Sequence, residues 1–223
     1  MNRRILLLSA ASAAVFAGGY SFFSRSGSGG VAPLMTGVAN AQDGEIDTSQ
    51  VMEMTLGNPD ADVTVIEYAS FTCPHCRTFH QTTFKDLKEN YIDPGRIHFI
   101  YREVYFDRFG LWAAMLARCA GAERYFGMTE ILYETQQEWT AGGDPAAVAE
   151  NLKKLGRTAG LSDEEVDACL QDGDKARAMV AVYQENAEAD DINATPSFVI
   201  DGEKYSNMSY EEFSAILDEK LES

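Results

Sequence analysis

The chain is 223 residues long. At roughly 100 to 200 residues per domain, this length allows one domain, or one domain with a sizeable insertion. With 45% hydrophobic, 24% charged and 11% aromatic residues, the chain is neither fibrous nor too polar to bury a core. Its net charge of −17, from 35 acidic and 18 basic residues, argues against nucleic acid or an anionic membrane surface as a partner. Both of these attract basic patches.

The first 41 residues have the pattern of an export signal. Arg3 and Arg4 precede an apolar, Ala-rich run that ends near Phe23, and Ala39-Asn40-Ala41 is a small-x-small cleavage site before the acidic part begins. We expect residues 1–41 to be an export signal of the general secretory or twin-arginine type, cleaved or kept as a membrane anchor, and residues 42–50 to be a linker. Each alternative places the remaining chain outside the cytoplasm, in the periplasm, where disulfides persist.

Two predicted strands precede a Cys-x-x-Cys motif. Val51 to Leu56 ends at a Gly-Asn-Pro-Asp turn cluster, and Val63 to Ser70 is a run rich in β-branched residues. After the motif, apolar residues recur at near-helical spacing from Phe79 until Pro94-Gly95, and Arg96 to Phe106 then alternates as a third strand. The order is therefore strand, Cys-x-x-Cys, helix, strand.

Helices dominate the chain from residue 107 to about 188, where apolar residues follow helical spacing. Ser197 to Ile200 is then a predicted strand, and Asp201-Gly202 is a hairpin turn. Ser209 and Glu212 form a capping box that begins a final amphipathic helix. The fold class is therefore α/β, with a long helical segment between the early and late strands.

The motif Cys73-Pro74-His75-Cys76 has the features of a redox site. Two cysteines three apart at a helix start lie on one face of the first turn, within the separation that a disulfide requires. Pro74 suits the first helical position, where its missing N–H breaks no bond. Unpaired backbone N–H groups and the positive end of the helix dipole favour a thiolate at Cys73, and His75 adds a donor or a positive charge.

Two other interpretations of this motif are weaker. As a structural clamp, a four-residue loop contributes only about 2 kcal/mol before strain. As a metal site, Cys73 and Cys76 would need His75 or His80, yet the sequence has no second Cys-x-x-Cys and no His-x-x-x-His to complete four ligands. We therefore predict redox chemistry with no metal and no cofactor beyond the cysteine pair itself. His80 and His98 receive no chemical role, and we expect them to be satisfied or solvated.

Cys119 and Cys169 require a separate explanation. Both lie on apolar faces of predicted helices, beside Met115 and Leu116 in one case and Val166 and Leu170 in the other. A disulfide that closes a loop of about 50 residues contributes up to roughly 4 kcal/mol. The sequence favours this structural disulfide over two buried free thiols.

The chain from Val51 to Ser223 resembles the DsbA-like thioredoxin family of exported thiol:disulfide oxidoreductases. The resemblance rests on Glu67 in its strand, on the Cys-Pro-His-Cys site, on the helical segment and on Thr195-Pro196 before a strand. It implies a thioredoxin fold interrupted by an all-helical insertion, with residues 51–106 and 189–223 as the two parts of the fold and 107–188 as the insertion. The surroundings of Cys119 and Cys169 resemble the branch whose insertion carries its own disulfide.

The resemblance also assigns roles near the cysteines. It implies that Pro196 is cis and packs beside the motif, and that the Thr195 backbone pairs with a substrate peptide. An ordinary trans proline is the alternative. Glu67 resembles the family's buried acid beneath the active site, which helps to move protons. A solvated glutamate is the alternative there, since alternation places Glu67 opposite Ile66 and Tyr68 without showing which face is covered.

These features predict an enzyme that donates its Cys73–Cys76 disulfide to unfolded exported polypeptides. Thr195 departs from the strongest oxidants of the family, which often have Val there, whereas isomerases often have Thr. The Pro74-His75 dipeptide between the cysteines favours oxidation, and no dimerisation domain precedes Val51. We therefore expect a monomeric oxidase rather than an isomerase or reductase. The resemblance implies reoxidation by a quinone-linked membrane partner. A non-catalytic metal carrier that uses the same cysteines is the alternative from another class.

Overall fold

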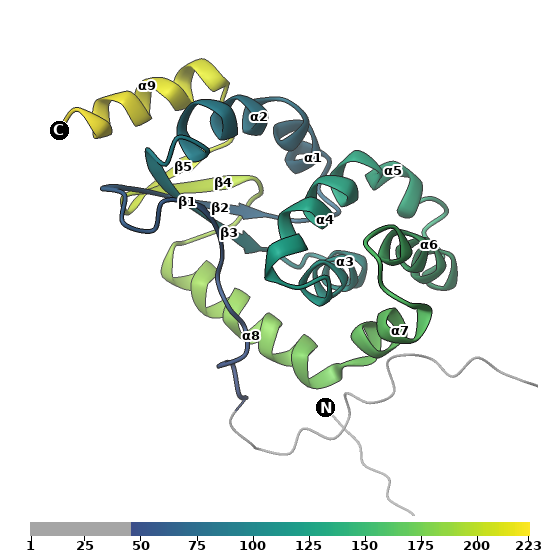
Figure 1. The fold of residues 1–223 in the computed structure, drawn as a ribbon. Coiled ribbons are helices and arrows are strands. Elements are labelled where there is room, and N and C mark those ends of the chain that lie inside the picture. The colour runs from purple at the N-terminus through teal and green to yellow at the C-terminus, as the bar shows by residue number, and fades with distance from the viewer. Residues whose placement is uncertain (1–45) are drawn as a thin grey trace, which may run out of the picture. The chain divides into compact units, whose positions relative to one another are not determined.

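The computed structural model describes residues 46–223 (Figure 1). The predicted export signal and the first part of the predicted linker lie outside the described residues. The described elements, in chain order, are β1 (Met54–Gly57), β2 (Val63–Ala69), α1 (Pro74–Gln81), α2 (Thr83–Leu87), the π-helical turn η1 (Lys88–Ile92), β3 (Ile97–Glu103), α3 (Arg108–Cys119), α4 (Ala122–Glu134), α5 (Gln136–Trp139), α6 (Pro145–Thr158), α7 (Asp163–Gln171), α8 (Gly173–Ala189), β4 (Ser197–Ile200), β5 (Glu203–Ser206) and α9 (Tyr210–Leu221).

The strands form one mixed sheet in the order β1-β3-β2-β4-β5. Strands β2 and β3 are parallel, and every other neighbouring pair is antiparallel. Helices α3 to α8 follow β3 and precede β4, so only helices separate the first three strands from the last two. This arrangement confirms the predicted α/β class and the helical interruption. The domain boundaries at residues 107 and 188 remain a prediction, and α8 continues to Ala189.

Both faces of the central strand β2 are covered, as is usual where a strand has a parallel neighbour. Tyr68 packs with Val104 and Val199 in a small core on one face, against which the α8 residue Tyr183 also packs. Val65 belongs to the main core. In Figure 1, α8 lies along one side of the sheet, and α1, α2 and α9 lie on the other. Since side chains alternate along a strand, Glu67 shares the face of Val65 and is fully buried.

Local signals at the C-terminal end of the chain act as the sequence predicts. The Asp201-Gly202 turn joins β4 to β5, and both residues have positive φ. Ser209 caps α9, with Oγ accepting from the N–H of Glu212 while the Glu212 carboxylate accepts from the N–H of Ser209.

The helix predicted from the motif to Pro94 is wrong as one continuous element. It breaks at Thr82, where φ is −125° and ψ is −92°, and continues as α2 and η1. The Thr82 hydroxyl donates to the Thr78 carbonyl at 2.8 Å. Such side-chain bonds to the backbone compete with regular helix geometry.

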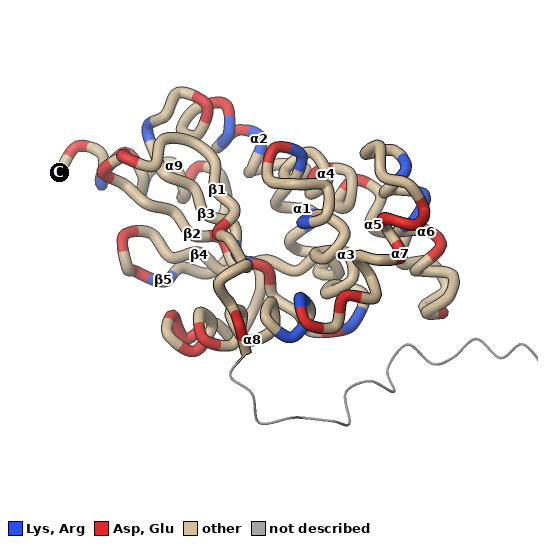
Figure 2. The backbone as a smooth tube through the Cα atoms, turned by 60° about the horizontal axis from the view of Figure 1, so that its bottom comes forward, with Lys and Arg blue, Asp and Glu red and all other residues tan. Residues whose placement is uncertain are grey.

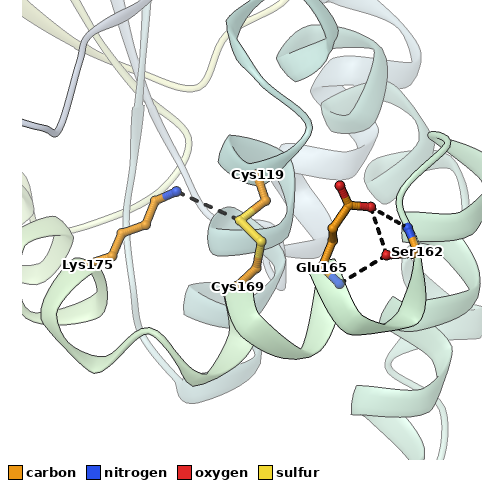
Figure 3. Close-up of a disulfide and its surroundings, with 5 residues drawn as sticks. All are labelled: Cys119, Ser162, Glu165, Cys169 and Lys175. Carbon is orange, nitrogen blue, oxygen red and sulfur yellow. Dashed lines mark hydrogen bonds between the residues drawn. A yellow bond between two sulfur atoms is a disulfide. The ribbon is translucent and has the colours of Figure 1, made fainter.

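Helix α3 packs against α4, α6 and α7, and α6 packs against α7. Helix α4 also packs against α1, so the helical segment adjoins the helix that carries the motif. A disulfide joins Cys119, the last residue of α3, to Cys169 in α7, with the two Cα atoms 6.3 Å apart (Figure 3). Lys175 at the start of α8 lies beside it, with Nζ 3.9 Å from the Cys119 sulfur. The figure also shows the Ser162–Glu165 capping box that begins α7.

We expect the Cys119→Ala/Cys169→Ala protein to lose about 4 kcal/mol of unfolding free energy relative to the disulfide-bonded chain. The bridge spans 50 residues, and in the chain-entropy model removing such a loop closure releases about this much entropy to the unfolded state. Urea unfolding of both proteins, with Cys73 and Cys76 kept reduced, measures the difference. Equal midpoints and slopes would exclude a structural role for this disulfide.

Acidic positions recur on α8, on α9 and at the β4–β5 turn, with basic positions interspersed (Figure 2).

Within residues 46–223, no helix combines the length and the apolar character that crossing a bilayer requires.

Candidate active site

Cys73 is the N-cap of α1 and Pro74 is the first helical residue, as the motif predicts. Cys73 has extended backbone angles, with φ −78° and ψ 121°, and its sulfur accepts the N–H of Cys76 at 3.4 Å. Both cysteines are free thiols here, with Cys73 half-buried and Cys76 buried. The start of the helix thus presents one reachable sulfur and hides the other.

The environment strongly favours a thiolate at Cys73. A hydrogen bond from the Cys76 thiol is the largest cause, and it lowers the pKa of Cys73 from 9.0 to about 5 together with the Thr195 side chain and the N–H groups of Cys76 and His75. Burial acts in the opposite direction. The predicted helix-start donors therefore contribute, but the neighbouring thiol is the strongest single donor.

Cys76 has the opposite character. Burial raises the pKa of the Cys76 thiol, and the neighbouring Cys73 and the charge of Glu67 raise it further. Cys76 has no exposed surface. At neutral pH one cysteine of the pair is therefore a half-buried thiolate and the other a buried thiol, which makes their roles in disulfide exchange unequal.

The Thr195-Pro196 loop lies against the motif. The peptide bond between these residues is cis, and the Cys73 thiol donates to the Thr195 carbonyl at 3.4 Å. The Thr195 hydroxyl oxygen is buried without a hydrogen-bond partner. The Thr195 side chain is also among the groups that lower the pKa of Cys73.

Glu67 lies behind the motif and pairs with His80. Its side chain has no exposure, and both carboxylate oxygens are 3.0 Å from Nε2 of His80. The solvated alternative for Glu67 is wrong, because α1 covers this face of β2. His80 is a satisfied buried histidine, whereas His98 on β3 is only partly buried.

His75 contributes to the site through its backbone. Its residue is exposed, and within residues 46–223 its imidazole makes no hydrogen bond. The backbone N–H of His75 donates toward the Cys73 sulfur and helps to lower the pKa of Cys73.

Two residues that the sequence did not single out hold the loop before the motif. The buried Gln136 of α5 donates to the carbonyls of Phe71 and Cys73 at 2.8 and 2.9 Å. Asp107, the N-cap of α3, accepts the Thr72 hydroxyl at 2.7 Å. A lone glutamine in a helical stretch carries no local signal, whereas Asp107 was detectable as a helix cap.

The described residues contain no group of three His, Cys, Asp or Glu side chains arranged to bind a metal ion.

Comparison with known proteins identifies the family. A protein-family model described as thioredoxin matches residues 49–219. The chain belongs to the thioredoxin family. Among solved structures, this thioredoxin-family chain is similar to alpha-DsbA1 of Wolbachia pipientis, with a TM-score of 0.71 and 27% identity over 76% of this chain and 91% of the other. The predicted membership of the DsbA-like branch is thereby confirmed.

Curated relatives agree with this membership. A Rickettsia bellii protein named as a protein-disulfide oxidoreductase is 34% identical over 76% of this chain and 65% of its own length. Disulfide bond formation protein D of Bacillus subtilis is 26% identical over 74% of this chain and 76% of its own length. This thioredoxin-family chain spans slightly less than two thirds of the Rickettsia relative.

Proposed function

We propose that this protein is a thiol:disulfide oxidoreductase that donates the Cys73–Cys76 disulfide to exported polypeptides as they fold. The observation that carries the proposal is the inequality of the two sulfurs, since the pKa of Cys73 is lowered to about 5 and that of Cys76 is raised. A low-pKa sulfur is a good leaving group, so the disulfide passes readily to another thiol. The names of the curated relatives support the same chemistry.

In the proposed reaction a substrate thiolate attacks Cys73 of the oxidised protein. The Cys73–Cys76 bond breaks, a mixed disulfide forms, and Cys76 leaves with the electron pair and takes up a proton. A second substrate thiolate then attacks the substrate sulfur of the mixed disulfide and releases Cys73 as a thiolate. The substrate gains a disulfide, and the protein has accepted two electrons.

The other site residues receive roles in this scheme. Pro74 and the N–H of His75 shape the helix start that supports the Cys73 thiolate. The Thr195 backbone and Pro196 hold an extended substrate segment beside Cys73. Glu67, buried near Cys76, exchanges the proton of that thiol. Cys119 and Cys169 stabilise the helical segment and take no part in the exchange.

The cellular setting is part of the proposal. We propose export to the periplasm through the N-terminal signal, cleaved or retained, followed by action as a monomer on unfolded polypeptides. A quinone-linked membrane partner would return the cysteine pair to the disulfide. A disulfide isomerase or reductase of the same fold is the second candidate, and Thr195 before Pro196 is the residue that favours it.

The redox equilibrium with glutathione separates these candidates. We expect a donor to equilibrate at a potential well above that of thioredoxin, about −270 mV, because a stabilised thiolate favours the reduced protein. The alkylated fraction of Cys73 at a series of glutathione ratios gives the value. A potential near that of thioredoxin would indicate a reductase. Stoichiometric bound zinc or copper together with no exchange would indicate a metal carrier.

A further inference from the structure

The proposed reaction creates a proton problem at Cys76. Each time the Cys73–Cys76 disulfide opens, the Cys76 sulfur must gain a proton, and each time it closes the sulfur must lose one. Cys76 has no exposed surface. Burial raises its pKa, so an unprotonated Cys76 is a high-energy species in this position. Proton exchange therefore needs a buried carrier.

Glu67 is close enough to Cys76 for its charge to raise the pKa of that thiol, but it is itself sealed from solvent. The carboxylate has no exposed surface and both of its oxygens are directed at His80. A proton that Glu67 receives or releases must pass through a neighbour that does reach water. His80 is the one side chain in the described part of the protein that hydrogen-bonds the Glu67 carboxylate.

His80 is also the inner wall of a cavity. A hollow of about 170 Å³ lies between α2 and α4, and its lining includes His80, Phe84 and Tyr133 from the interior and the exposed residues Lys85 and Glu130 at its rim. This volume admits more than one water molecule. The His80 side chain retains 5% exposure, whereas Glu67 has none. His80 thus borders the cavity, whereas Glu67 is not among the residues that line it.

The packing holds the imidazole in a fixed orientation. Tyr133 of α4 stacks on the ring with centroids 4.3 Å apart, Phe84 of α2 packs at 4.5 Å, and Tyr101 of β3 meets it edge-on at 5.8 Å. The hydroxyls of Tyr101 and Tyr133 are hydrogen-bonded to each other at 2.7 Å. Burial raises the pKa of both tyrosines well above the ordinary value, so neither competes for the proton.

The titratable and charged groups facing His80 are thus few. Glu67 lies on the sheet side, the two tyrosines flank the ring, and Cys76 shares α1. Lys85, Lys88, Glu130 and Glu134 line the cavity. Since Nε2 is used by Glu67, Nδ1 is the nitrogen left for water.

We propose that His80 is a positioning and proton-relay residue that connects the Glu67 carboxylate, and through it Cys76, to water in the cavity between α2 and α4. The inference rests on the proposed disulfide donation. When Cys76 leaves as a thiolate, the Nε2 proton of His80 passes to the Glu67 carboxylate, Glu67 passes a proton on to Cys76, and Nδ1 takes up a proton from the solvent through the cavity water. On reoxidation the three proton transfers run in reverse, and the two electrons go to the reoxidising partner of the proposed function.

The test is a single-turnover measurement on His80→Gln. An amide keeps a hydrogen bond to Glu67 but does not relay a proton. The reduction of the Cys73–Cys76 disulfide by a dithiol peptide is followed by acid quench and alkylation from pH 5 to 8. We expect a rate on the order of 10²-fold lower, the lower end of what positioned proton transfer contributes. The rate of the variant should also depend on pH differently from that of the wild type, while the Cys73 pKa stays unchanged. His98→Gln, a histidine outside the site, is the matched control and should behave as wild type.

Chemical rescue separates a relay from a purely structural role. His80→Ala opens space beside the existing cavity, and added imidazole should restore its rate while leaving His98→Ala unaffected. The inference is overturned if folded His80→Gln exchanges at the wild-type rate and profile, or if it is slowed equally at every pH and imidazole does not restore His80→Ala. If the wild-type protein itself transfers no disulfide, the proposed function fails, which is a different result.

Discussion

Cys73→Ser is expected to reduce disulfide transfer to the rate of the reaction without protein. The Cys73–Cys76 disulfide is the group that accepts two electrons from the substrate, and a protein with serine at position 73 cannot form it. Cys76 offers no substitute, because it is buried and its thiol pKa is raised. Oxidation of a reduced dithiol peptide, followed by the loss of free thiols, measures the effect.

Cys76→Ser should behave differently, although it also blocks turnover. Cys73 remains half-buried and reachable, so its thiolate should attack a disulfide-linked peptide dimer, form a mixed disulfide with one peptide and release the other as a thiolate. With no thiol at position 76, this mixed disulfide has no internal sulfur to resolve it. Non-reducing electrophoresis would detect these covalent species in Cys76→Ser and not in Cys73→Ser. The Cys119→Ala/Cys169→Ala protein is the matched control and should keep exchange activity. Mixed disulfides through Cys76 in the Cys73→Ser protein would contradict the assigned order of attack.

The parts of this site that the sequence predicts are those that depend on neighbouring residues. A cysteine at the N-cap, proline at the first helical position and a second cysteine one turn later define their own geometry. The capping box of Ser209 and Glu212 is similar, because its bonds join residues three apart. Such patterns are read directly, since no distant contact can easily override them.

The parts that the sequence does not predict depend on distant contacts. Glu67 and His80 are 13 residues apart and meet only because α1 folds back over β2. Gln136 reaches the carbonyl of Cys73 from 63 residues away. Whether Glu67 is buried depends on which helices cover the sheet, and alternation within the strand cannot show this. The break at Thr82 cannot be predicted from apolar spacing, because that spacing continues through Phe84 and Leu87 on the far side of the break.

The second large effect concerns the acidity of Cys73. We expect its thiol to titrate near pH 5, about four units below its ordinary value of 9.0, which is roughly a 10⁴-fold increase in the acid constant. Thiolate absorbance or the rate of alkylation against pH gives the midpoint. Because the Cys76 thiol is the largest cause, Cys76→Ala should raise the Cys73 pKa more than Cys76→Ser, which keeps a hydroxyl donor. Equal values in both variants would exclude that hydrogen bond as the cause.

This acidity links folding stability to pH in the reduced protein alone. Cys73 has a lower pKa when folded than when unfolded, so its thiolate stabilises the fold fully above about pH 9, and this contribution is lost as the pH falls to about 5. The full lowering of the Cys73 pKa corresponds to about 5 kcal/mol of unfolding free energy. We expect roughly 2 to 3 kcal/mol of this, because water screens the charge on a half-exposed sulfur.

The reduced protein should therefore gain stability over the oxidised one as the pH rises from 5 to 8, below the range where the raised pKa of Cys76 opposes the effect. Parallel urea unfolding of the two forms measures the gap between their unfolding free energies. The same gap drives disulfide donation, since whatever stabilises the reduced fold makes the oxidised protein the stronger oxidant. A gap that does not change with pH would leave the proposed direction of electron flow without a physical cause, even if Cys73 reacts rapidly.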